Sequence, residues 1–208
     1  MFIALGGVFT LGALAVVLAW RRERNAKSVF PAENASALLN PARRLIQRPE
    51  QAIREFGIGS GDRVLELGPG PGYFTPHVAR TVSPTGSVLA VDLQPAMLRE
   101  LRTRLSLETL PHVRMVAADA TRLPFRGDAF DAAFLVAVLG EIADPARAMA
   151  ELRRVLRPGG VVSFCETFND PDYVREGALR ELCWSAGLRV VERRRKLLGY
   201  VLRCERVD

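Results

Sequence analysis

The chain has 208 residues, a net charge of +6 and an apolar content of 49%, enough for one domain with a sizeable core plus an appendage. This composition argues against a disordered chain. The cysteines number three and stand far apart in the sequence, which excludes a disulfide framework and a zinc-site pattern. We therefore expect no metal site and a reducing compartment.

The first twenty residues carry no charged side chain. As a helix they would be about 30 Å long, the thickness of the hydrocarbon core of a bilayer. The basic run RRERNAK follows them, whereas a cleaved signal peptide has its positive charge in front of the apolar run. The sequence thus predicts a single-pass transmembrane anchor over 1–20, with the rest of the chain in the cytoplasm. A signal peptide and a buried helix are the alternatives.

Residues 21–39 are expected to form a basic juxtamembrane linker, which is either simply solvated or attracted to anionic headgroups. The next stretch, 40–57, predicts two short helices that start at Asn40-Pro41 and Pro49-Glu50, with Gly57 as the stop. This helical segment either only packs on the main domain or forms a lid, or membrane-facing collar, around a substrate entrance.

Residues 58–208 alternate between strand and helix patterns, which predicts an α/β domain: a Rossmann-like, seven-stranded, mostly parallel sheet with helices on both faces. The last two strands are joined only by RRRK, too short for a crossover helix, so they should form an antiparallel hairpin. The predicted strands are 63–67, 87–91, 113–117, 131–136, 161–165, 189–192 and 198–204. The predicted helices are 74–81, 95–105, 145–156 and 175–186.

The first of these strands runs into a glycine turn, VLELGPGPGYFT. In a doubly wound sheet, ligands bind at the carboxyl ends of the strands, where the strand order reverses. Gly68 and Gly70 would let the backbone approach a ligand, and Gly72 would open a helix whose N-terminal amides favour an anionic group. Dinucleotide enzymes place a similar turn here. The third glycine, however, comes one residue early, which argues against a pyrophosphate ligand.

Carboxylates follow at successive strand ends: Glu66, Asp92 and Asp119. Asp92 can accept both hydroxyls of a ribose, and Asp119 can accept from an adenine amino group. Three carboxylates around one turn suit a ligand that carries positive charge. S-adenosylmethionine, with its sulfonium and ammonium groups, is such a ligand.

The blocks DRVLELGPGPGYFT, GSVLAVDLQPAML, VRMVAADATRLPF, FDAAFLVAVLGEI and ELRRVLRPGG, in this order, resemble the class I S-adenosylmethionine-dependent methyltransferases, especially the ubiquinone/menaquinone C-methyltransferase branch. The resemblance covers about residues 40–208. It implies a methionine subsite, a ribose carboxylate, an adenine subsite and a contact near the transferred methyl group. For the methionine subsite it implies Gly68, Gly70 and Pro71, with Glu66 reaching the ammonium group through water. Asp92 would hold the ribose, and Val136 would lie near the transferred methyl group. The adenine subsite would consist of Leu93, Asp119 and Ala120.

Related enzymes often carry a histidine just after the fourth strand, where this chain has Gly140. That departure puts a histidine base in doubt and leaves Glu141 and Glu166 as candidate catalytic bases, unless they are merely solvated. The chain has no inserted substrate domain, and a short domain tethered to a bilayer can collect acceptors from the lipid phase at high effective concentration. We therefore expect a small hydrophobic or lipid-like acceptor: a quinone precursor, a lipid amine or a thiol.

Two other classes of function stay open, a nicotinamide-dependent oxidoreductase and a catalytically silent membrane adaptor. The adaptor would use the basic surface that includes the RRRK run. The sequence holds no recognisable nucleic-acid module, which argues against a nucleic-acid partner. The oligomeric state stays open.

Overall fold

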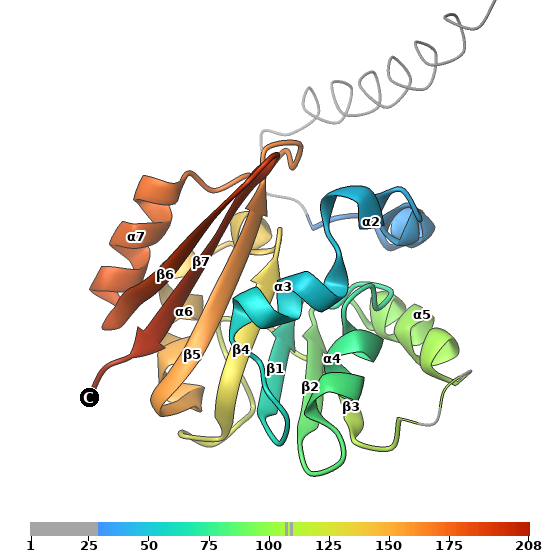
Figure 1. Cartoon of the computed structure of the whole chain (residues 1–208), viewed down its shortest axis with the longest axis horizontal. Helices are drawn as coiled ribbons and strands as arrows, with labels where there is room; N and C mark the ends of the chain where they lie inside the picture. Colours follow the sequence, from blue (N-terminus) through green and yellow to red (C-terminus); the bar gives the residue numbers. More distant parts are fainter. Residues whose placement is uncertain (1–28, 107, 109) are drawn as a thin grey trace, which may run out of the picture.

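The computed structural model describes residues 29–106, 108 and 110–208, and within them one seven-stranded sheet forms the centre of the molecule (Figure 1). The strand order is β3-β2-β1-β4-β5-β7-β6, and only β7 runs antiparallel to its neighbours. The predicted C-terminal hairpin is thereby confirmed. The strands are β1 (Arg63–Leu67), β2 (Ser87–Asp92), β3 (Val113–Ala117), β4 (Phe130–Val136), β5 (Leu156–Thr167), β6 (Leu188–Lys196) and β7 (Gly199–Arg206).

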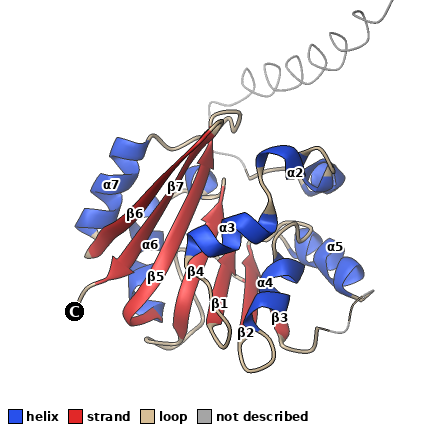
Figure 2. Cartoon of the chain, viewed as in Figure 1, coloured by secondary structure: helices blue, strands red, loops and turns tan. Residues whose placement is uncertain are grey.

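Helices cover both faces of the sheet (Figure 2). The α helices are α2 (Arg43–Ile46), α3 (Pro49–Phe56), α4 (Thr75–Val82), α5 (Pro95–Leu105), α6 (Pro145–Val155) and α7 (Glu176–Ser185); η1 (Ala32–Leu39) and η2 (Leu139–Glu141) are 3₁₀ helices. Proline near the N-terminus starts α3, α5 and α6, where its missing N–H costs no hydrogen bond. The contacts of the helices with the strands put α3, α4 and α5 on one face and α6 and α7 on the other.

The core consists of one apolar layer on each face of the sheet. Along β1, Val64 belongs to the layer under α3 and α4, whereas Leu65 and Leu67 belong to the layer under α6 and α7. Because strand side chains alternate between the two faces, Glu66 points to the same face as Val64. A carboxylate is thus built into an otherwise apolar layer.

The strand order reverses at β1, which pairs with β2 on one side and with β4 on the other. Strands β1 to β5 all end at the same edge of the sheet, which we call the carboxyl edge. The glycine turn that follows β1 therefore lies at the topological switch point, as the sequence predicted.

Strand β5 is longer than the predicted 161–165, and three further details differ from the sequence-based expectations. Residues 32–39, expected within a linker, form the 3₁₀ helix η1. The RRRK run, expected as the connection between the last strands, lies inside β6; its Arg193, Arg194 and Lys196 form ion pairs with Glu176, Glu192 and Glu55. Cys183 and Cys204, distant in sequence, bring their sulfur atoms within 3.3 Å in the core. The RRRK run is placed by the pairing of β6 with β7, and the two cysteines meet because α7 packs on the sheet; neither arrangement can be read from spacing along the chain.

The predicted transmembrane anchor, 1–20, and the basic run that follows it lie outside the described residues. Within the described ranges, none of the helices combines the length and the apolar composition that a membrane span needs.

Candidate active site

The glycine turn has a backbone that only glycine adopts easily. Gly68, Gly70 and Gly72 all have positive φ, at 67°, 54° and 88°. Space is equally restrictive, because a Cβ on Gly68 would overlap the side chain of Val138, and one on Gly72 would overlap Leu101 of α5. The turn is thus fixed in shape by β1 behind it and by its neighbours on both sides.

Asp92, the last residue of β2, connects its strand to this turn. One carboxylate oxygen accepts the N–H of Gly70 at 3.3 Å, and the other accepts the N–H of Gln94 at 2.9 Å. The residue is 7% exposed, and burial raises the pKa of its carboxyl above the usual value. Each oxygen of a carboxylate can accept more than one hydrogen bond, so Asp92 retains capacity for ribose hydroxyls.

Glu66 is the most unusual polar group of the site. It is 2% exposed, and its Oε2 atom is buried without a hydrogen-bond partner. Burial raises the pKa of this carboxyl to about 8, with a further contribution from the negative charge of Asp92. The hydroxyl of Thr75, also buried without another partner, lies close enough to lower this pKa somewhat, so the carboxyl has a neighbour within the chain and keeps capacity for a donor from a ligand. The ammonium group of S-adenosylmethionine has the charge and the donors to satisfy it, and these residues therefore fit that cofactor.

The chain before α3 lies over the carboxyl edge, and we call residues 29–48 the strap. Phe30 donates its N–H to Glu141 Oε2 at 3.1 Å and accepts from Gln94 Nε2 at 2.8 Å, so it bridges the segments that follow β4 and β2. Farther along, Leu38 Cδ1 lies 3.3 Å from the place that a Cβ of Gly70 would occupy. The strap therefore covers the glycine turn.

Arg43 of α2 holds the strap in this place. Its guanidinium carbon lies 4.3 Å from the centre of the Tyr73 ring, close enough for a cation–π contact. Arg43 Nη1 donates to the carbonyl of Leu38 at 3.1 Å, and Tyr73 Oη donates to the carbonyl of Gln47 at 2.7 Å. Burial lowers the pKa of Arg43. Sequence reasoning missed these contacts, because nothing in the pattern NPARRLIQ shows which arginine turns inward.

The other predicted cofactor residues lie at neighbouring strand ends. The N–H of Ala118 donates to the carbonyl of Asp92 at 3.1 Å, which brings the segment of Asp119 and Ala120 beside the end of β2. Asp119 is exposed and accepts from the N–H of Thr121 at 2.8 Å. Leu93 is 56% exposed, and Val136 is the last residue of β4. Pro71 is buried within the turn. Their roles toward the cofactor stay predictions.

The two candidate bases differ in environment. Glu166 lies inside β5 rather than beyond it, and it is buried, at 2% exposure, rather than solvated. It accepts the N–H of Val174 at 3.1 Å, and burial raises the pKa of its carboxyl to about 8. Because it alternates with Cys165, it points to the face of the sheet opposite to Glu66. Glu141 ends η2 and accepts from the strap, as described above. Catalytic roles for both stay predictions.

Part of the chain is similar to known proteins. Residues 65–164 match the family model described as a methyltransferase domain. An uncharacterised 37.1 kDa protein of a Streptomyces fradiae transposon is 43% identical over 100 residues, which are 48% of this chain and 28% of that protein. The ubiquinone/menaquinone biosynthesis C-methyltransferase UbiE of Pasteurella multocida is 36% identical over 119 residues, which are 55% of this chain and 44% of that enzyme. The chain thus spans less than half the length of these curated relatives.

A solved structure, described as a SAM-dependent methyltransferase from Aquifex aeolicus, superimposes with a TM-score of 0.81. It is 22% identical in sequence, and the alignment covers 86% of this chain and all of the other. At this identity the likeness establishes the fold. Together with the family match and the UbiE relatives, it supports an S-adenosylmethionine-dependent methyltransferase, and S-adenosylmethionine is the cofactor that this class of enzyme uses.

Proposed function

We propose that this protein transfers the methyl group of S-adenosylmethionine to a small hydrophobic acceptor at the carboxyl edge of the sheet. The observation that carries the proposal is the buried Oε2 atom of Glu66, which lacks a partner beside a glycine turn of fixed shape. A cationic ligand there satisfies the carboxylate. The similarity to UbiE enzymes makes a quinone precursor the first acceptor to test, followed by a lipid amine and a thiol.

When bound, S-adenosylmethionine supplies a methyl group on a sulfonium that is already an excellent leaving group. The work left to the chain is to position the reactants and exclude water. Glu66 would hold the ammonium group and Asp92 the ribose, while Leu93, Asp119 and Ala120 would border the adenine. The strap covers the glycine turn and keeps solvent from it. A general base is needed only if the acceptor arrives protonated.

We further propose that residues 1–20 anchor the protein in a membrane with the catalytic domain in the cytoplasm. The support is the uncharged apolar stretch of helix-spanning length and the basic run behind it. An anchor would keep the domain near acceptors dissolved in the lipid phase, at a high effective concentration.

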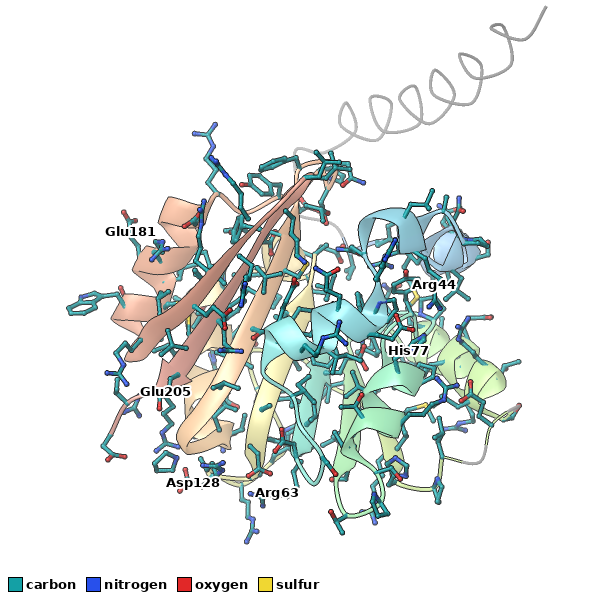
Figure 3. All side chains as sticks on the ribbon, in the orientation of Figure 1. Arg44, Arg63, His77, Asp128, Glu181 and Glu205 are labelled. Atoms are coloured by element: carbon teal, nitrogen blue, oxygen red, sulfur yellow. The ribbon has the colours of Figure 1, made fainter. Side chains whose placement is uncertain are left out.

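Titration calorimetry of the full chain in lipid nanodiscs tests the cofactor. We expect micromolar binding of S-adenosylmethionine, none of NAD, and loss of at least tenfold in affinity in Asp92→Asn, which keeps the size of the side chain but removes its charge. Asp128→Asn is the matched control, because Asp128 lies at the opposite edge of the sheet (Figure 3). Binding of NAD in place of S-adenosylmethionine would favour the oxidoreductase, and binding of neither by a folded protein would favour the adaptor.

A further inference from the structure

The large exposed apolar side chains of the described residues are not spread evenly over the molecule. Most of them lie at the carboxyl edge: Val29, Leu45, Leu93, Phe168 and Leu197. Leu197 is 91% exposed at the turn of the β6–β7 hairpin, and Phe168, 58% exposed, directly follows β5. The N–H of Phe168 donates to the carbonyl of Leu198 at 2.9 Å, so these two apolar tips are neighbours. Isolated exposed apolar residues need no explanation, but a group at one edge does.

Exposed arginines accompany these tips. Arg195 lies two residues before Leu197, Arg175 ends the loop that Phe168 begins, and Arg48 is the last residue of the strap. Leu45 of α2, 82% exposed, stands beside the exposed Arg44, which Figure 3 labels at the end of the molecule away from Arg63. Apolar tips among basic side chains are the combination by which peripheral proteins enter the headgroup region of an anionic bilayer.

The course of the chain before the described residues also points to a membrane at this edge. The described chain starts at Val29, and Phe30 is fixed at the carboxyl edge by Gln94 and Glu141. Residues 21–28, which precede Val29, carry a net positive charge, and residues 1–20 carry no charged side chain. The eight intervening residues can span at most about 30 Å, so the uncharged stretch ends within that distance of this edge.

We infer that the carboxyl edge is a docking surface for an anionic lipid bilayer, with Leu197 and Phe168 inserted among the headgroups. The acceptor then reaches the active site from the lipid phase, because the glycine turn lies at the edge that touches the membrane, beneath the strap. This inference rests on the proposed membrane-anchored function and adds an orientation: the anchor does more than tether a freely tumbling domain.

The test labels the full chain with an environment-sensitive fluorophore at Leu197→Cys and, separately, at Trp184→Cys. Trp184 is a fair control because it is 84% exposed and lies in the last turn of α7, near the start of β6 and away from the β6–β7 turn. The native cysteines are buried and should not react in the folded protein. In vesicles of phosphatidylcholine with phosphatidylglycerol, we expect a blue shift and at least threefold stronger quenching by brominated lipid at position 197 than at 184. Equal quenching at both positions overturns the inference.

A second measurement separates this surface from the chemistry. Leu197→Glu and Phe168→Glu should lower methyl transfer to a quinone precursor embedded in vesicles by about tenfold while leaving the affinity for S-adenosylmethionine unchanged; Trp184→Glu should change neither. Unaltered transfer in all three variants counts against the docking surface. If the protein without any substitution does not bind S-adenosylmethionine, the proposed function is refuted. The fluorophore comparison would still show whether the carboxyl edge docks on the bilayer.

Discussion

Gly140 packs directly against the backbone carbonyl of Asp172, so closely that a Cβ on Gly140 would overlap that oxygen. Gly140 lies in η2 at the end of β4, and Asp172 lies in the loop between β5 and α7. The position at which related enzymes carry a histidine is therefore filled here by the backbone of another loop. A histidine at position 140 could not be accommodated unless the backbone around Asp172 moved.

We expect Gly140→Ala to destabilise the protein by about 2 kcal/mol or more, because backbone has to move to admit the new methyl group. Gly177→Ala is the matched control: nothing lies within 4 Å of its would-be Cβ, and the residue is in α7, where alanine favours helix. Urea unfolding of both variants measures the difference. A Gly140→Ala protein as stable as Gly177→Ala would show that the two loops separate easily.

The sequence was sufficient for features that depend on local pattern. Strands β1 and β3 and helix α5 have the predicted bounds, because apolar runs end there at turn residues or at a helix-starting proline. The glycine turn and Asp92 also lie together as predicted, since both follow from the order of parallel strands. What the sequence did not reveal depends on contacts between distant segments: the strap over the turn, Arg43 on Tyr73, and the loop against Gly140. Such contacts leave no periodic signal.

Gly68→Ala should abolish measurable binding of S-adenosylmethionine. The substitution combines a positive φ, which alanine adopts reluctantly, with an overlap against Val138, so the turn has to change shape. Gly59→Ala is the control, because its would-be Cβ has only Asp62 Oδ2, at 3.8 Å, as a neighbour. Calorimetric titration of both variants is the measurement. Retained affinity in a folded Gly68→Ala protein would mean that the turn does not line the cofactor.

Glu66 should make stability and binding depend on pH. Its pKa is raised to about 8 in the folded state, so between about pH 4.5 and 8 the unfolded chain binds fewer protons than the folded one. Stability is therefore fully present below pH 4.5 and falls as the pH rises toward 8. Glu66→Gln should remove this loss and be more stable than the parent protein by a few kcal/mol at pH 8, with little difference at pH 4.5.

The same carboxyl should release a proton when a cation binds beside it. Calorimetry of S-adenosylmethionine binding at pH 7, in buffers of different ionisation enthalpy, should detect this release in the parent protein and lose it in Glu66→Gln. Glu166, whose pKa is also raised to about 8 on the other face of the sheet, is the internal control. If Glu166→Gln removes the released proton instead, Glu66 is not the group that meets the ammonium.

Arg43 should set how long the cofactor stays bound. Arg43→Met keeps an aliphatic stem over Tyr73 but loses the cation–π contact and the hydrogen bonds to Leu38 and Gln47, together worth about 1 to 2 kcal/mol. The strap should then open more often, which would speed dissociation of S-adenosylmethionine roughly tenfold and raise the rate of hydrogen exchange in residues 29–48.

Arg44→Met is the control, because Arg44 is the exposed neighbour that pairs with Glu50, and this substitution should change neither rate. Equal effects of the two variants would mean that charge on α2, and not the stacking of Arg43, governs release; no effect of either would mean that the strap does not control access to the glycine turn.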